Sequence, residues 1–115
     1  MVINKSERPV TVNENMRGGN GAVIIEHVLD KNGLNEKGRL YAKIILKPGC
    51  SIGEHVHEGE MESFFILKGI AAYNDNGVPV ELGAGDVTHT ADGQNHAVAN
   101  NGAEDVEMMA LIIYQ

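Results

Sequence analysis

Short apolar runs separated by turn residues make up most of this chain. Each run is as long as a strand and is rich in Val, Ile, Leu or aromatic residues, with Gly, Asn, Asp or Pro at its ends. Helix signals are nearly absent, and roughly seven to ten short strands at this spacing predict an all-β sandwich or barrel. The runs are GAVIIEHVLD, RLYAKIILKPG, ESFFILKG, IAAYNDNGVPVEL, GDVTHT, HAVAN and VEMMALIIYQ.

Alternation within the runs predicts which side chains face the core, because successive side chains of a strand point to opposite faces. The Asn76-Gly77 pair is a strong turn signal, so residues Ile70–Tyr73 and Val78–Leu82 are expected to form a hairpin. In RLYAKIILK the even positions form the predicted core face: Leu40, Ala42, Ile44 and Leu46.

Two runs are apolar on both faces, although one barrel interior buries only one face of each strand. The other face is expected to expose Phe65, Leu67, Met109, Leu111 and Ile113, a patch that is uncommon on a soluble monomer. We therefore predict a homodimer, with the strand around residues 10–12 reaching toward the partner. The competing interpretation is that the N-terminal thirty residues cover this face within one chain.

Length and charge narrow the class of protein. A chain of 115 residues is expected to form one domain, residues 1–115. The net charge of −7 argues against a nucleic acid or an anionic membrane as partner, since both require a cationic face. Cys50 is the single cysteine, so no internal disulfide is possible. With no apolar leader and no run of eighteen apolar residues, we expect a cytoplasmic protein that binds a small molecule.

The stretch GEHVHEGEME carries the candidate chemistry. A strand would aim His55 and His57 at the same side, and Glu62 follows five residues later, at the start of an apolar run. Two imidazoles and a carboxylate in one space suit a divalent cation. The neighbouring carboxylates are expected to form a solvated acidic rim: Glu54, Glu58 and Glu60.

Two spaced motifs resemble the signature of the cupin family. The first runs from Gly49 to Gly69 with the histidine pair and Glu62 in register, and the second runs from Gly85 through Gly93 and His96 to Asn100. One departure is Ala91, where the family usually has proline. The resemblance implies a double-stranded β-helix, or jelly-roll barrel, with a metal inside. The ligands that it implies are His55, His57, Glu62 and His96.

Three imidazoles and one carboxylate would leave a divalent ion with one net positive charge. Because the set has no thiolate, it suits one divalent transition metal, namely Fe, Mn, Zn, Ni or Cu. In an octahedral field, four protein ligands would leave two open positions for water, substrate or dioxygen.

Other residues are candidates for the surroundings of this metal. His89 lies where the family often places an aromatic residue facing the cavity, so it is a candidate catalytic group that orients substrate or moves a proton. The alternative is that it fills the aromatic slot with one hydrogen bond. We expect His27 and Cys50 to be structural, and the alternation makes Arg39 a doubtful cavity residue. The predicted substrate-pocket residues are Phe64, Ile66, Met108 and Ile112.

A cupin barrel does not by itself define a function. We favour a metalloenzyme acting on a small oxygen-rich molecule, with dioxygenase, isomerase and lyase chemistry all left open. The alternative is a non-catalytic module that binds or senses a small ligand or the metal.

Overall fold

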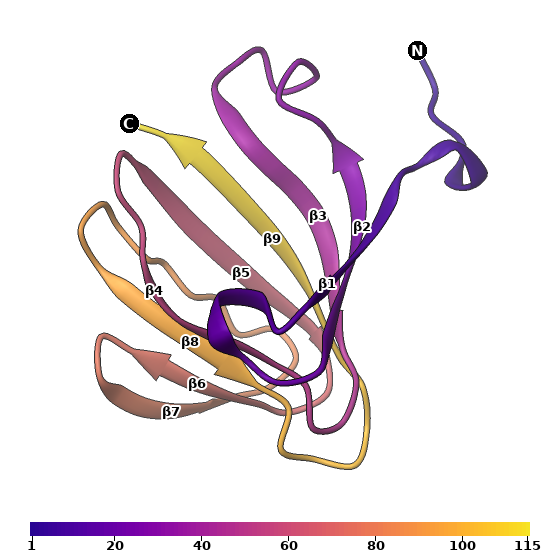
Figure 1. Ribbon diagram of the computed structural model, residues 1–115. Coiled ribbons are helices and arrows are strands. Elements are labelled where there is room, and N and C mark those ends of the chain that lie inside the picture. The colour runs from indigo at the N-terminus through magenta and orange to yellow at the C-terminus, as the bar shows by residue number, and fades with distance from the viewer.

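The computed structural model describes residues 1–115, and strands make up nearly all of its regular structure (Figure 1). Two single 3-10 turns are the only helical elements, and neither is long and apolar enough to cross a membrane. The elements are η1 (Lys5–Glu7), β1 (Val10–Glu14), η2 (Met16–Gly18), β2 (Ala22–Leu29), β3 (Gly38–Leu46), β4 (Ser51–Val56), β5 (Glu60–Lys68), β6 (Ala71–Asp75), β7 (Val78–Leu82), β8 (Asn95–Ala99) and β9 (Val106–Tyr114).

The strands form two antiparallel sheets that face each other across the core. One sheet has the order β1-β2-β3-β9-β5 and the other has the order β4-β8-β6-β7. The chain passes from the first sheet to the second between β3 and β4, and returns between β4 and β5. This arrangement confirms the predicted all-β jelly-roll barrel.

The core lies between the two sheets and follows the alternation of the sequence. On β3, Ala42, Ile44 and Leu46 are at most 1% exposed, which confirms three of the four predicted core positions. The fourth, Leu40, is partly buried and packs against the core. Burying an aliphatic side chain of this size contributes about 1.5–3 kcal/mol. The predicted hairpin is also present, because β6 pairs with β7 and both Asn76 and Gly77 have positive φ, as a type I′ turn requires.

Backbone hydrogen bonds close the barrel along one seam between the sheets. The segment 85–90 pairs with β5 there, with bridges from Glu62 to Thr90 and from Phe65 to Val87. Thr90 N donates to Glu62 O at 2.8 Å, and Glu62 N donates back at 2.9 Å. This closed seam fixes Glu62 against the second sheet.

The opposite seam is held by the η2 turn. Ser51 N donates to Asn20 O at 2.9 Å, and Asn20 N donates to Ser51 Oγ at 2.8 Å. Two glycines allow this close approach: a Cβ at Gly19 would lie 2.2 Å from Ser51 O, and one at Gly53 would lie 2.1 Å from Arg17 O. The η2 turn is therefore packed backbone to backbone against β4.

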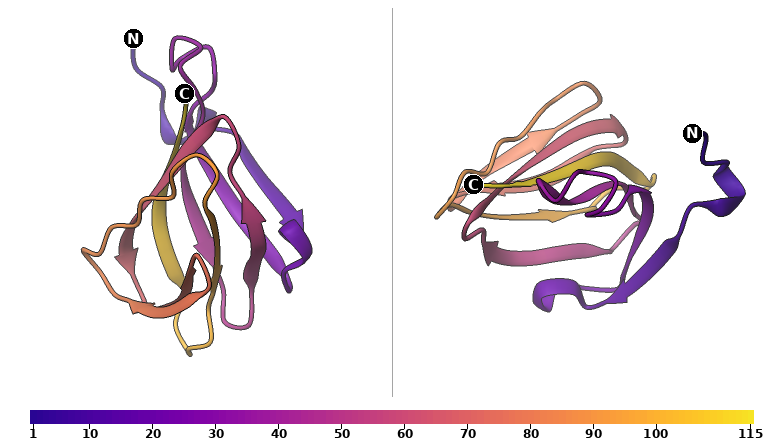
Figure 2. Two further views of the ribbon diagram at one scale, coloured as in Figure 1. Left: turned by 90° about the vertical axis from the view of Figure 1, so that its left-hand side faces the viewer. Right: turned by 90° about the horizontal axis from the view of Figure 1, so that it is seen from above.

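The outer face of the five-stranded sheet is open and carries several apolar side chains beside the Lys43–Glu107 ion pair. Phe65, Leu67 and Ile113 are 45%, 42% and 39% exposed. The N-terminal thirty residues supply β1 and β2 of this same sheet, and the segment before β1 extends away from the barrel (Figure 2). The interpretation that these residues cover the face within one chain is therefore wrong.

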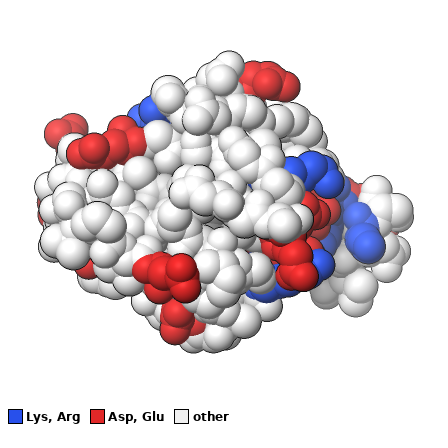
Figure 3. All heavy atoms as spheres, turned by 90° about the horizontal axis from the view of Figure 1, so that it is seen from below, with Lys and Arg blue, Asp and Glu red and all other residues white.

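Charged side chains of both signs occur together on the surface. Seen from below, much of the surface is uncharged, and the basic groups gather at one side next to acidic groups (Figure 3). Several are ion-paired, including Lys43 with Glu107 and Lys47 with Asp105. This face therefore carries no continuous positive patch.

Candidate metal centre

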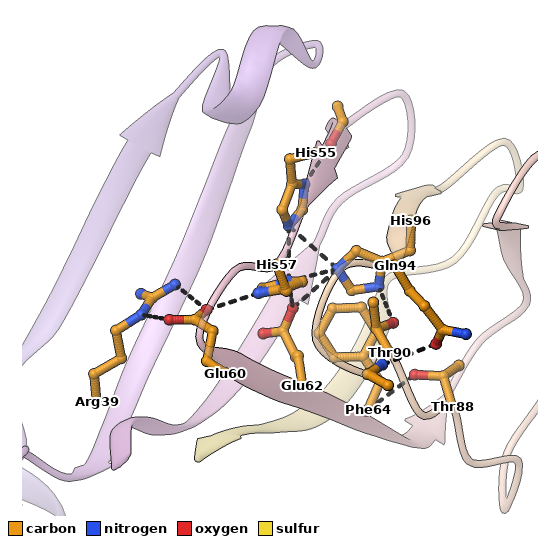
Figure 4. Close-up of polar contacts among 12 residues, drawn as sticks. Arg39, His55, His57, Glu60, Glu62, Phe64, Thr88, Thr90, Gln94 and His96 are labelled. Carbon is orange, nitrogen blue, oxygen red and sulfur yellow. Dashed lines mark hydrogen bonds and ion pairs between the residues drawn. The ribbon is translucent and has the colours of Figure 1, made fainter. Parts of the chain in front are cut away.

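Four side chains from both sheets converge inside the barrel (Figure 4). His55 lies on β4 and His57 just beyond its end, while Glu62 comes from β5 and His96 from β8. His55 and His96 are paired across the β4–β8 ladder, and the closed seam brings Glu62 to them. The structure thus brings together all four ligands that the cupin resemblance implied.

The donor atoms of these residues are evenly spaced around one point. The three imidazole Nε2 atoms lie 3.0–3.2 Å from one another. Glu62 Oε1 lies 3.0 Å from Nε2 of both His57 and His96. The remaining pair, His55 and Glu62, is farther apart, although all four donors lie within 4.8 Å of one another.

This spacing distinguishes between coordination geometries. With metal–ligand distances of about 2.1 Å, adjacent ligands of an octahedron lie ~3.0 Å apart and opposite ligands ~4.2 Å apart. A tetrahedron of the same size would give six equal distances of ~3.4 Å. The five printed distances of 3.0–3.2 Å are closer to the octahedral than to the tetrahedral spacing. A metal held by these four residues in that way would keep two positions for a further ligand.

Hydrogen bonds at the other ring nitrogen orient each histidine. His55 Nδ1 donates to Gly53 O at 2.8 Å, and His57 Nδ1 donates to Glu60 Oε2 at 2.7 Å. His96 Nδ1 lies 2.7 Å from the Tyr73 hydroxyl and 3.0 Å from Thr90 Oγ1. Because Nδ1 is engaged in each ring, Nε2 is the nitrogen that faces the centre of the group, where a metal would take the place of its proton.

Glu60 is part of this arrangement and not part of a solvated rim, which corrects the sequence prediction. It is 8% exposed, and its two oxygens accept from Arg39 Nε and Nη2, both at 2.8 Å. This bidentate pair lowers the pKa of Glu60 to about 2. Glu54 and Glu58 are exposed, as predicted. Glu60 has the same strand parity as Glu62, and that parity was the signal available in the sequence.

The ionised state of Glu62 makes the site favourable for a bound cation. Burial disfavours the ionised form of Glu62, but hydrogen bonds from His57 and His96 outweigh it and lower the pKa of this carboxyl. The hydrogen bond with Glu62 raises the pKa of His57, whereas desolvation lowers the pKa of His55. Glu62 is 4% exposed and lies among three imidazoles. An ionised carboxylate with three imidazoles is a donor set suited to a divalent transition metal.

A cavity of about 280 Å³ opens on this group from the side of β1, β2 and η2. Of the predicted pocket residues, Ile112 lines it, and Phe64 stacks on the His96 ring with centroids 5.2 Å apart. Ile66 and Met108 lie in the hydrophobic core and do not line the cavity. The cavity is lined by Thr11, Asn13, Met16, Arg17, Ile25, His27, Arg39, Leu40, Ile44, Ile52, His55, His57, Glu62 and Ile112.

The sequence prediction for His89 is wrong in its placement. His89 is exposed, while Thr88 and Thr90 on either side are 7% and 2% exposed. Alternation therefore points the two threonines inward and His89 outward. The candidate catalytic histidine does not face the cavity, and we assign it no part in this site.

His27 and Arg39 reach the cavity instead, although the sequence prediction left both out. His27 shares the inward parity of Val23 and Ile25, and its Nε2 lies 3.0 Å from Thr11 Oγ1. Arg39 lies at a register shift between Gly38 and Leu40, so alternation along the strand does not predict the direction of its side chain. Parity would have found His27, but not Arg39.

Comparison with known proteins agrees with this architecture. The family model of the cupin domain matches residues 42–114. The chain is 44% identical over 113 residues to a Thermotoga maritima protein named oxalate-binding protein, covering 98% of this chain and 93% of that protein. A crystal structure from Thermotoga maritima, described as a predicted oxalate decarboxylase, is 43% identical with a TM-score of 0.94 and full coverage of both chains.

More distant structures share the fold alone. A putative sugar phosphate isomerase from Acidithiobacillus ferrooxidans has 15% identity and a TM-score of 0.77, over 99% of this chain and 75% of that one. With the motif spacing, the two-sheet barrel and the family match together, the chain belongs to the cupin family. It is similar throughout its length to an oxalate-binding member of that family.

Proposed function

We propose that this protein holds one divalent transition metal through His55, His57, Glu62 and His96, and that it binds a small dicarboxylate at that metal. The observation that carries the proposal is the donor spacing, with five pairs at 3.0–3.2 Å and one longer pair. This spacing suits an octahedral ion such as Mn, Fe or Ni better than tetrahedral zinc. Two remaining positions suit a ligand that chelates through two oxygens.

Oxalate is the leading candidate for this ligand. It chelates a metal through one oxygen of each carboxylate, and it is small enough for a cavity of about 280 Å³. The similarity to a protein named for oxalate binding, at 44% identity, supports the same choice. Of the functions considered from the sequence, the binding module therefore has the more direct support.

The metal would supply the chelating positions and withdraw charge from the bound carboxylates. The residues of this chain hold the site in shape. Gly53, Glu60 and Tyr73 fix the histidine rings through Nδ1, and the apolar wall that includes Ile112 and Ile44 excludes water from one side of the cavity. The result is a preformed site that requires little reorganisation on binding.

A second candidate function is decarboxylation of the same ligand, because a relative with 43% identity is described as a predicted oxalate decarboxylase. Converting oxalate to formate and carbon dioxide requires one proton on the carbon that remains. His27 is a cavity side chain that can carry a proton without being in the donor set, and it lies on the wall with Thr11. It is the residue we would assign to that role.

The test begins with metal analysis of the purified protein, followed by removal and reloading with Mn, Fe, Ni or Zn. Calorimetric titration of each form with oxalate measures binding, and carbon dioxide release over hours measures turnover. We expect one metal per chain, oxalate binding that depends on the metal, and loss of both in His96→Ala. Full metal occupancy in that variant would contradict the proposed site. Release of carbon dioxide that is lost in His27→Gln would favour the enzymatic function.

We further propose that the protein is a homodimer that buries the outer face of the five-stranded sheet against a second copy. Fully burying a large apolar side chain contributes about 1.5–3 kcal/mol, and the apolar side chains of this face are already about half-buried, so each adds roughly 0.7–1.5 kcal/mol. Five of them, doubled by twofold symmetry, give about 7–15 kcal/mol, which is comparable with an association cost of about 4–15 kcal/mol. The exposed apolar residues that support this proposal are Val10, Val12, Phe65, Leu67 and Ile113.

A further inference from the structure

Two arginines line the metal cavity, and only one of them is free to bind a ligand. Arg39 is held by Glu60 through two hydrogen bonds of 2.8 Å. Arg17, on the η2 turn, makes no side-chain hydrogen bond or ion pair within the protein. The N–H groups of its guanidinium therefore have no partner in the protein, and their parallel arrangement matches the two oxygens of a carboxylate.

The backbone of Arg17 is fixed at the edge of this cavity. Its φ of 55° and ψ of 30° lie in the left-handed region, where a side chain other than glycine is uncommon. The carbonyl of Arg17 packs against Gly53, two residues before His55 on the same strand. Met16 beside it is half-buried and packs against the hydrophobic core. The turn thus places an unpaired cation next to a strand that bears metal ligands.

Charge in the cavity indicates what this cation is for. A divalent metal held by one carboxylate and three neutral imidazoles carries one net positive charge, and the paired Arg39 cancels Glu60. A chelated dicarboxylate would then leave one uncompensated negative charge, whereas a monocarboxylate would leave none. Arg17 supplies the missing positive charge only for the dianion.

We propose that Arg17 binds the carboxylate oxygens that do not contact the metal and so selects dicarboxylate dianions over monocarboxylates. This inference rests on the proposed function, because it requires a ligand chelated at the metal. Arg17 would be a specificity-determining residue and would not take part in holding the metal.

The experiment compares oxalate with glycolate, which chelates through one carboxylate and one hydroxyl and carries a single negative charge. Metal-loaded wild type, Arg17→Gln and Arg17→Lys are each titrated with both ligands by calorimetry. Lys5→Gln is the matched control, because it removes one positive charge from an exposed position outside the cavity. Metal affinity is measured separately by competition with a chelator, with neither ligand present.

We expect Arg17→Gln to weaken oxalate binding by about tenfold or more, with glycolate binding and metal affinity within twofold of wild type. Arg17→Lys should recover part of the loss, and Lys5→Gln should match wild type. Equal losses for oxalate and glycolate, or an unchanged oxalate affinity in Arg17→Gln, would overturn the role of Arg17 while leaving the proposed function intact. Failure of metal-loaded wild type to bind oxalate would overturn both. Circular dichroism confirms that the variants are folded before titration.

Discussion

Replacing Glu60 with alanine should weaken metal binding although Glu60 is not one of the four donors. Its Oε2 accepts from His57 Nδ1 at 2.7 Å, and this bond selects the tautomer that presents Nε2. Loss of such a supporting partner typically lowers metal affinity by about 10–100-fold, or about 1.4–2.7 kcal/mol. Three charge-assisted hydrogen bonds are lost in total, so the metal-free protein should also be destabilised by about 1–3 kcal/mol.

The neighbouring residues supply a graded set of controls. Glu58→Ala removes an exposed carboxylate two residues away, and it should leave both quantities within error of wild type. Arg39→Ala keeps the Glu60–His57 bond and should therefore cost less metal affinity than Glu60→Ala. The variant leaves the carboxylate of Glu60, whose side chain is 11% exposed, without its cationic partner, so it should lower the stability of the metal-free protein.

Chelator competition measures metal affinity, and urea unfolding of the metal-free protein measures stability. Equal metal affinities in Glu60→Ala and Glu58→Ala would refute the role assigned to the His57–Glu60 bond. A loss in Arg39→Ala as large as that in Glu60→Ala would show that the ion pair, and not the orientation of His57, supports the site.

Three other predictions follow from the same geometry. Metal affinity should fall steeply as pH drops through about 6.5, because protons compete with the metal for three imidazoles. Competition at His57 should begin at a higher pH than at the other two, because the pKa of His57 is raised. An affinity that does not change with pH would exclude the histidines as ligands. In the metal-free folded protein the pKa of Glu60 is lowered from 4.5 to about 2, so the stability that this ionised carboxylate contributes is complete above pH 4.5 and is lost as pH falls toward about 2. The difference in free energy of unfolding between wild type and Glu60→Ala, measured in urea, should therefore vanish over that pH range. Sedimentation should give twice 12.4 kDa for wild type and a shift toward monomer for Phe65→Ser with Leu67→Ser, whereas a single species of 12.4 kDa for wild type would rule out the dimer.

Much of the fold could be predicted because alternation in the strands is a local property. The even positions of β3 and the Asn76-Gly77 hairpin need only neighbouring residues, and both are present. The four-donor group was implied by the resemblance to the cupin family within residues 49–100, and not by local alternation, because its members come from both sheets.

The surroundings of the candidate metal depend on long-range contacts, and there the sequence was a poorer guide. Arg39 and Glu60 are 21 residues apart and meet only because β3 and β5 flank β9. The placement of Arg17 requires the η2 turn to cross to β4, which the glycine-rich stretch around it did not indicate. The prediction for His89 was wrong for a different reason, because the residue type usual at this position in the family was given more weight than strand alternation.

The two seams of the barrel are held differently, and we expect this difference to set the order in which they open. The seam at β5 has reciprocal backbone hydrogen bonds between Glu62 and Thr90, whereas the seam at β4 is held by the η2 turn through Ser51 and Asn20. Backbone amides at the η2 seam should therefore exchange with deuterium through brief local openings, long before those of β9 and β5, which require global unfolding. Each such opening would separate the sheets on the side where the cavity meets solvent. The rate of ligand dissociation would therefore be set by the rate at which the η2 turn opens locally.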